Sequence, residues 1–550
     1  MTAWLRRRPT VTALFALASL TLVLGAGPAA AATRAPQPAA SSSGASSSAT
    51  SGSWTVYHGD AAGRGVAAPI AAVNTTTRAW TSPVLDGEIY GEPLVSSGRV
   101  YVATEDDTVY ALSAATGAVA WSAHLGSPVP STDLPCGNIT PTVGITGTPV
   151  IDQSRGEIFV VADELVNGKP AHVFAGLATA TGKVEVTQDV DPPGADTAAL
   201  LQRTGLTLDD GQVVFGMGGN YGDCAAYRGR VIAVKETGGT PKIFTVDAAA
   251  GESQGAVWMG GAAPVVDSSG DIWVTAGNGS VYSYSQPYDD SDSILELSPS
   301  LNLLQFFAPT TWATNNSQDL DMSTAPALLS DGQVILSGKS RIVYLLDGAH
   351  LGGIGGQQAA LGSACGQDID GGVAVQGTTV YLPCFSGITA VRAARSPAAL
   401  QLLWSSGTGG GPAIVAAGLI WTIGQNGVLY GLSPATGQVR QQASIGAPAN
   451  HFPTPSVADG LLLAPTADQV VAFTASASAA AGTPSTATST GTNTATNAAP
   501  TSRASSPPAA AAPGGGGLPA GAIAGLVVAG LLVISGAGWV IWRRRTTGPR

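Results

Sequence analysis

Residues 92–126 read EPLVSSGRVYVATEDDTVYALSAATGAVAWSAHLG, and this stretch predicts a sheet of four short antiparallel strands. An apolar strand around Leu94 is followed by the turn Ser96-Ser97-Gly98 and by a second strand at residues 100–103. Two further strands follow, at residues 109–112 and 119–122. Short β-branched and aromatic runs separated by Ser, Gly and Asp are typical of an all-β unit.

The second strand of this unit recurs along the chain at intervals of 39 to 62 residues. The equivalent strands begin at Val100, Ile158, Val213, Ile272, Val334, Val380, Leu419 and Leu461. A repeat of this length that is made of strands indicates a β-propeller. We therefore predict an all-β fold, an eight-bladed β-propeller of four-stranded antiparallel blades.

The last repeat, residues 451–474, has only three strands before the composition changes at Ala475. Residues 78–83, RAWTSP, are similar to the fourth strand of the first repeat, which contains Ala120-Trp121-Ser122. We predict that this N-terminal strand completes the last blade, because pairing it there closes the ring and removes two open strand edges.

Residues 111–121, ALSAATGAVAW, resemble the tryptophan-docking motif A-x-D-x-x-T-G-x-x-x-W of the pyrroloquinoline-quinone (PQQ) repeat propellers. In that family the Thr-Gly pair forms the turn between the third and fourth strands, and the Trp packs against the next blade. The resemblance implies a quinoprotein-like fold for the whole repeat region, in an extracytoplasmic bacterial protein. The motif positions, degenerate copies included, are Thr116, Gly117, Trp121, Thr181, Gly182, Trp404, Thr436 and Gly437.

The same resemblance raises a second hypothesis, a PQQ- and Ca²⁺-dependent dehydrogenase of alcohols or sugars. The alcohol-oxidising members of the family have adjacent Cys residues over the cofactor, whereas no two of the four Cys here are adjacent. Their metal ligands and catalytic base have no matching motif in this chain. We therefore expect no catalytic residue, no metal and no cofactor, with PQQ and Ca²⁺ present only under the dehydrogenase hypothesis.

The long loops of this chain are not spread evenly over the predicted propeller. The turns between first and second strands are short, whereas the loops between second and third strands and the connections between blades are long. In a propeller these long segments share one face, called here the long-loop face, and the short turns lie on the opposite, short-turn face. This segregation indicates that the long-loop face binds the ligand. The long segments are residues 126–147, 216–229, 277–293, 309–324 and 351–371.

The candidate binding residues are polar and aromatic side chains of these loops. The carboxylates have the oxygen chemistry that Ca²⁺ prefers. We favour the interpretation that Asp292 and Asp321 cap or hydrogen-bond the loop backbone and that the other carboxylates are solvated. The rings have the shape to stack on a sugar or a quinone, with loop packing as the favoured role. The set is Tyr221, Asp223, Trp258, Asn278, Tyr282, Tyr288, Asp289, Asp292, Trp312, Asn315, Asp319 and Asp321, together with Tyr284, Asp290 and Asn316.

The four Cys residues allow three pairings, and an even number in an exported chain indicates disulfides. Cys365 lies in the connection that enters the sixth blade, and Cys384 ends the second strand of that blade, so both fall on the long-loop face. We predict Cys365–Cys384 and, by elimination, Cys136–Cys224.

The ends of the chain predict export and anchoring. Residues 1–32 have the basic start, apolar stretch and small-residue end of a signal peptide, and residues 33–53 read as a disordered linker. The propeller spans 54–474 and is followed by an Ala/Ser/Thr/Pro/Gly-rich stalk at 475–517, a transmembrane helix at 518–542 and a basic cytoplasmic tail at 543–550. Leu518-Pro519-Ala520-Gly521 resembles a sortase signal without its Thr, so we favour membrane retention over cell-wall attachment.

The charge balance restricts the partner. Seven of the 25 basic residues lie in the signal peptide and the tail, so the exported part carries 18 basic against 36 acidic residues. This surface disfavours nucleic acid as a partner. We predict a membrane-anchored extracellular propeller that acts as a non-catalytic binding or scaffold module for a protein or a glycan.

Overall fold

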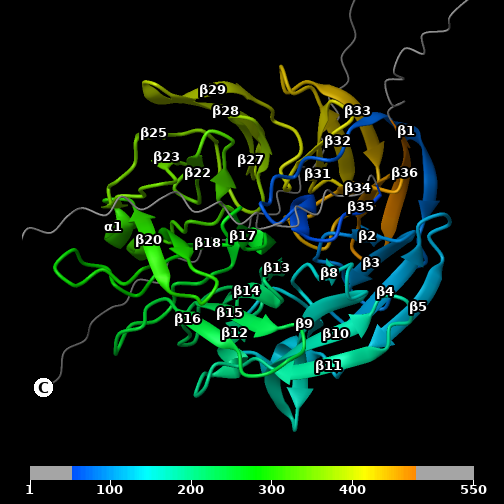
Figure 1. Cartoon of the computed structure of the whole chain (residues 1–550), viewed down its shortest axis with the longest axis horizontal. Coiled ribbons are helices and arrows are strands. Elements are labelled where there is room, and N and C mark those ends of the chain that lie inside the picture. Colours follow the sequence, from blue (N-terminus) through cyan, green and yellow to red (C-terminus); the bar gives the residue numbers. More distant parts are fainter. Residues whose placement is uncertain (1–51, 478–550) are drawn as a thin grey trace, which may run out of the picture. The chain divides into compact units, whose positions relative to one another are not determined.

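The computed structural model describes residues 52–477, which form the eight four-stranded blades of a β-propeller (Figure 1). The fold expected from the repeats is confirmed. The predicted signal peptide, transmembrane segment and cytoplasmic tail, and nearly all of the predicted linker and stalk, lie outside the described residues. Within residues 52–477, no helix has the length and apolar character needed to span a bilayer.

Blades 1 to 4 follow one another along the chain, with the first strand of each innermost. Their strands are β2 (Leu94–Ser96), β3 (Arg99–Ala103), β4 (Thr108–Ser113) and β5 (Val119–His124); β8 (Val150–Asp152), β9 (Glu157–Val166), β10 (Lys169–Ala178) and β11 (Val184–Asp189); β13 (Thr207–Asp209), β14 (Gln212–Gly219), β15 (Arg230–Lys235) and β16 (Lys242–Thr245); and β17 (Val265–Val266), β18 (Ile272–Ala276), β19 (Ser293–Leu297) and β20 (Leu303–Ala308).

Blades 5 to 8 complete the ring. Their strands are β21 (Ala327–Leu328), β22 (Gln333–Leu336), β23 (Val343–Asp347) and β25 (Ala359–Leu361); β26 (Ala374–Gln376), β27 (Thr379–Cys384), β28 (Gly387–Arg395) and β29 (Ala398–Ser405); β30 (Ile414–Ala416), β31 (Leu419–Gly424), β32 (Val428–Leu432) and β33 (Val439–Ser444); and β34 (Ser456–Ala458), β35 (Leu461–Pro465), β36 (Val470–Ala477) and β1 (Ile70–Thr81).

The eight second strands begin within one residue of the positions expected from the sequence. They are apolar on both faces because each blade is packed between two neighbours, as the buried residues of β3 show. The outermost strands alternate instead, and Val119 on β5 is 41% exposed. The core is therefore divided into layers between blades.

The ring is closed by the N-terminal strand, as predicted. β1 pairs antiparallel with β36, with Arg78 opposite Phe473 and Trp80 opposite Ala472. Blade 8 thus takes three strands from one end of the described chain and one from the other (Figure 1).

Tryptophan side chains join neighbouring blades at the Thr-Gly turns. Trp121 on β5 donates its indole N–H to the carbonyl oxygen of Thr179 in blade 2, at 3.0 Å. Its ring lies against Gly182, where a Cβ would come within 2.5 Å of the ring. The pairs Trp80–Gly117 and Trp404–Gly437 repeat this contact between blades 8 and 1 and between blades 6 and 7.

The segment before β1 crosses the centre of the ring, a feature that the repeat pattern did not predict. Trp54 exchanges two backbone hydrogen bonds of 2.8 Å with Val95 of blade 1. Further backbone bonds join Thr55 to blade 2, Ala61 to blade 4, Arg64 to blade 6, and Gly65 and Ala67 to Val415 of blade 7. Figure 1 shows this dark-blue segment among the innermost strands β2, β17 and β34. We call residues 54–67 the axial segment.

Three connections contain more structure than the sequence indicated. Residues 351–371, expected to be a loop, supply β25, the fourth strand of blade 5, and β24 (Gly353–Ile354), which extends blade 4 in parallel with β20. Residues 126–147 hold the pair β6 (Val129–Pro130) and β7 (Thr142–Val143), and 309–324 hold α1 (Trp312–Gln318). The remaining short elements are β12 (Leu200–Leu201), which pairs with the end of β14, and the 3-10 turns η1 (Tyr57–Gly59), η2 (Ser131–Asp133), η3 (Thr197–Ala199) and η4 (Met259–Gly261).

Candidate functional site

The connections between blades meet at the centre of the long-loop face. Arg203, from the connection between blades 2 and 3, lies 5.5 Å from the ring centre of Tyr90 and 5.2 Å from that of Phe452. Phe452 in turn contacts Trp258 edge to face, with ring centres 5.9 Å apart. These residues come from four different connections between blades, so these connections meet at one end of the ring.

Beneath them the axial segment fills the ring centre. The Tyr57 ring stacks on His58 with centroids 4.4 Å apart, and both side chains are buried. The Tyr57 hydroxyl accepts a hydrogen bond from the Gly372 N–H, at 3.2 Å, and lies 3.4 Å from the Thr454 hydroxyl. Gly372 has no room for a side chain, because a Cβ there would come within 2.6 Å of both rings.

The buried groups at this centre are held in their uncharged forms. The His58 backbone N–H donates to the Glu92 carboxyl at 2.7 Å. Burial raises the pKa of Glu92 well above its usual range and lowers the pKa of His58 to about 4. Neither side chain is poised to exchange a proton with a ligand, because both are sealed from solvent beneath the loops.

Two of the predicted carboxylates, Asp289 and Asp292, are buried in the blade 4 loop. Asp289 accepts hydrogen bonds from the Ser291 hydroxyl at 2.6 Å and the Val281 N–H at 3.3 Å, and Asn315 donates to Asp292 at 2.5 Å. Asp289 and Asp292 therefore hold the blade 4 loop against α1. Burial raises the pKa of Asp292 well above its usual range.

Lys339 forms salt bridges with two further predicted carboxylates, Asp319 and Asp321. Its ammonium lies 2.9 Å from Asp319 and 2.6 Å from Asp321, and 5.5 Å from the ring centre of Trp258. Burial alone would lower the pKa of Lys339, but Asp321 and Asp319 raise it above its usual value. Asp321 also accepts the backbone N–H of Asn278 at 2.7 Å. Lys339, which lies between β22 and β23 of blade 5, was not predicted from the sequence.

Three of the predicted tyrosines are exposed, and they lie on the loops of blades 3 and 4. Tyr221 is 72% exposed, Tyr282 55% and Tyr284 56%. Tyr282 donates to the Gln254 side chain at 3.3 Å, and the Tyr284 hydroxyl lies 2.8 Å from that of Thr314. By contrast Tyr288 packs between Phe306 and Trp312, so it belongs to the loop core.

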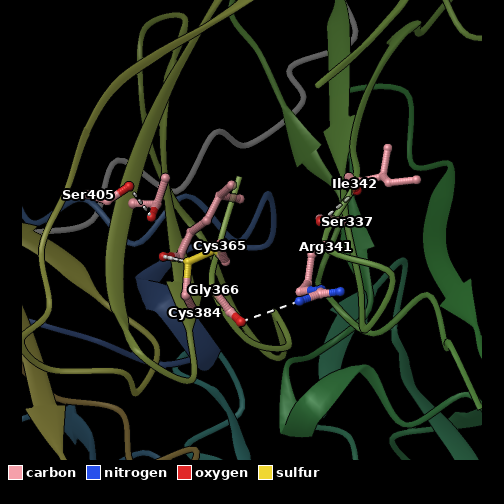
Figure 2. Close-up of a disulfide and its surroundings, with 9 residues drawn as sticks. Ser337, Arg341, Ile342, Cys365, Gly366, Cys384 and Ser405 are labelled. Atoms are coloured by element: carbon pink, nitrogen blue, oxygen red, sulfur yellow. Dashed lines mark hydrogen bonds between the residues drawn. A yellow bond between two sulfur atoms is a disulfide. The ribbon is translucent and has the colours of Figure 1, made fainter. Parts of the chain in front are cut away.

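Both predicted disulfides are confirmed. Cys136–Cys224 joins the connection after blade 1 to the blade 3 loop that carries Tyr221, with a Cα–Cα distance of 6.1 Å. Cys365–Cys384 fixes the connection before blade 6, with a Cα–Cα distance of 5.7 Å. Figure 2 shows this second bridge beside Arg341 of blade 5, whose guanidinium donates to the Gly366 carbonyl at 3.4 Å. The long loops are thus tied to neighbouring blades.

The predicted acidic residues of the blade 4 loops already have partners within the described chain. A divalent ion needs carboxylates that are free to bind it, whereas Asp319 and Asp321 pair with Lys339 and Asp292 pairs with Asn315. We derive no catalytic step from this site.

Comparison with known proteins supports the fold. The family model described as outer membrane protein assembly factor BamB matches residues 41–162 and 67–291. Among solved structures, quinohemoprotein alcohol dehydrogenase ADHIIG from Pseudomonas putida HK5 is 14% identical, with a TM-score of 0.58 over 79% of this chain and 82% of that one. The quinohemoprotein alcohol dehydrogenase from Comamonas testosteroni is 16% identical, with a TM-score of 0.59 over 78% and 81%.

A europium-containing methanol dehydrogenase is 13% identical, with a TM-score of 0.56 over 78% of this chain and 98% of that one. Identities this low show a shared fold and nothing about activity. No curated protein sequence matches the chain.

Proposed function

The chain belongs to the PQQ-repeat β-propeller family, and from this premise we propose that it is a non-catalytic module that binds a protein or a glycan through its long-loop face. The observation that carries the proposal is the filled ring centre. Residues 54–67 bond to the inner strands of five blades, and Tyr57 and His58 are buried within the ring. Recognition is then left to the outer surface of the loops.

The exposed tyrosines of blades 3 and 4 are the anchors that we propose for this surface. A Tyr ring offers a large apolar area with a polar tip at a small cost in side-chain entropy, which is why Tyr is enriched at interfaces. Tyr221 is carried on a loop tied down by Cys136–Cys224, and Tyr282 and Tyr284 are each hydrogen-bonded through their hydroxyls. The anchors are therefore positioned before the partner arrives.

We further propose that the propeller lies outside the cell, held by the apolar segment at residues 518–542. Two disulfides between loops support an oxidising compartment. The alternative is the dehydrogenase hypothesis. The dehydrogenases that share this fold motivate the direct test with PQQ and Ca²⁺ described in the Discussion.

Replacing Tyr221, Tyr282 and Tyr284 together with Ser should abolish partner binding and leave the fold intact. Losing one hot-spot residue weakens binding by about 2 kcal/mol or more, so the loss of three, about 6 kcal/mol, should exceed a thousandfold. The measurement compares wild-type and variant full chains, on intact cells of the host, by cross-linking of surface proteins and by binding to a panel of cell-envelope glycans.

A matched variant carries the same number of changes on the short-turn face: Gln153→Ala, Asp210→Asn and Ser269→Ala. It should retain every partner that the wild type binds. Equal loss in both variants, or full binding by the tyrosine variant, contradicts the proposed surface. Labelling of intact cells with an antibody against the propeller checks the location in the same experiment, since a propeller inside the cell would stay unlabelled.

A further inference from the structure

The two disulfides of the described chain differ in their access to solvent. Cys365 is 6% exposed and Cys384 1%, and both belong to the hydrophobic core between blades 5 and 6. Cys224 is exposed and Cys136 is half-buried. Thiol–disulfide exchange requires a thiolate to reach one of the two sulfurs, so buried disulfides resist reduction and exposed disulfides are the labile ones. Cys136–Cys224 is therefore the bridge that is open to exchange.

The Cys136–Cys224 bridge joins the tips of two loops at the surface. Residues 221–224 are all exposed, and none of residues 131–138 is buried. The bridged residues are 88 positions apart in sequence, with a Cα–Cα distance of 6.1 Å. Because the bridge lies between exposed segments, a reductant can reach it without first opening a blade.

Two hydrogen bonds hold the base of the exposed tip at residues 221–224. The Asn220 side chain donates to the Ala198 carbonyl oxygen at 2.9 Å, just before the tip. The Tyr227 hydroxyl donates to the Asp223 carboxylate at 2.7 Å. Neither bond involves Cys136 or Cys224, so both remain when the bridge opens. Reduction should therefore loosen the tip and leave blade 3 folded, since exposed loops open at a small fraction of the free energy of global unfolding.

We propose that Cys136–Cys224 is a site of thiol–disulfide exchange, which a molecule with two thiols opens and which sets how firmly the loop tip with Tyr221 is held. One thiolate of this dithiol attacks the Cys224 sulfur, and the S–S bond breaks to release Cys136 as a thiolate, which takes up a proton. The second thiol loses its proton and attacks the mixed disulfide. Cys224 leaves, takes up a proton, and the dithiol becomes a disulfide. Two electrons thus pass from the dithiol to the bridge, and the reverse reaction forms the bridge again.

The consequence for binding rests on the proposed function, in which Tyr221 is one of the anchors. An anchor that is held in place before binding loses less conformational entropy when the partner arrives. The oxidised chain should therefore bind its partner more tightly than the reduced chain, and the redox state of this bridge regulates the long-loop face.

The first experiment treats the purified full-length chain, folded and in detergent, with dithiothreitol for increasing times. Free thiols are blocked with iodoacetamide, and mass spectrometry of peptides identifies the labelled Cys residues. Cys136 and Cys224 should be labelled about tenfold faster or more than Cys365 and Cys384, because only the first bridge is accessible. The proposal is overturned if the two bridges open at equal rates or if Cys365–Cys384 opens first.

A second experiment uses chymotrypsin, which cleaves after Tyr, to measure the release of the tip. Cleavage after Tyr221 should become about fivefold faster or more when the bridge is reduced. The double variant Cys136→Ser, Cys224→Ser should show the fast rate without reductant. The matched control Cys365→Ser, Cys384→Ser should respond to the dithiol as the wild type does. Equal cleavage of the oxidised and reduced wild-type chains would show that the bridge does not hold the tip.

Neither experiment requires the partner, so both decide the exchange site independently of the proposed function. With a partner identified by surface cross-linking, the Cys136→Ser, Cys224→Ser chain should bind it about tenfold more weakly than the oxidised wild type. Equal binding by the two chains would contradict the regulatory role. If neither chain binds a partner, the proposed function fails, and the labelling and cleavage rates still decide whether the bridge exchanges.

Discussion

Deleting residues 52–81 is expected to leave no cooperatively folded propeller. The deletion removes the axial segment, which bonds to the inner strands of five blades, and β1, the outer strand of blade 8. It also removes the buried side chains of Trp54, Tyr57 and Trp80. Truncating one large buried aromatic residue costs about 3–5 kcal/mol, so three of them approach or exceed the whole stability of a domain, about 5–15 kcal/mol.

A second, shorter deletion distinguishes the contribution of the axial segment to stability from that of β1. A chain that lacks residues 52–67 keeps β1 and Trp80, so it should fold with a lowered Tm and an open ring centre. Both variants keep the signal peptide, and circular dichroism with thermal unfolding provides the measurement. If the chain without residues 52–81 unfolds cooperatively at the wild-type temperature, ring closure by β1 does not hold the propeller together.

Replacing Gly182 with Val is expected to destabilise the protein by about 3 kcal/mol or more, through strain at positive φ added to overpacking. Gly182 has φ +74, and a Cβ there would come within 2.5 Å of the Trp121 ring. The ring is held in place by its hydrogen bond to Thr179, at 3.0 Å, so it has no free direction in which to move. Urea unfolding of wild type and variant measures the loss.

Gly211 provides the matched control because its φ is also +74, while a Cβ there would meet nothing within 4 Å. Gly211→Val carries the backbone strain without the collision, so it should lose about 1–2 kcal/mol. Equal losses in the two variants would show that the tryptophan contact between blades contributes nothing to stability.

The repeat pattern and the ring closure were predictable from sequence because each depends on local information. A strand that is buried on both faces is apolar throughout, and the turn before it carries Gly, Asp or Ser. Second strands such as those at Val100 and Ile158 can therefore be recognised in the sequence. The closing strand was found because Trp80 occupies the docking position seen at Trp121. The Cys365–Cys384 disulfide followed from placing both residues at one end of the sixth blade, and Cys136–Cys224 followed by elimination.

The axial segment was not predictable in the same way. Residues 54–67 bond through backbone atoms to blades far apart in sequence, and backbone bonding leaves no periodic side-chain pattern. The pairing of Lys339 with Asp319 and Asp321 was missed for a related reason, since 18 to 20 residues and the two strands β21 and β22 separate the partners. Loop residues take their roles from tertiary contacts, and this is why Asp289, expected to be solvated, is instead buried and accepts hydrogen bonds from Ser291 and Val281.

Isothermal titration calorimetry of PQQ into the purified full-length chain, with Ca²⁺ present, is the most direct test of the claim that this propeller binds at its surface and performs no reaction. With Tyr57 and His58 buried on the axis, we expect no heat beyond dilution and no PQQ-dependent dye reduction with simple alcohols or aldose sugars. Stoichiometric PQQ binding, with turnover that requires both the quinone and Ca²⁺, would contradict the account.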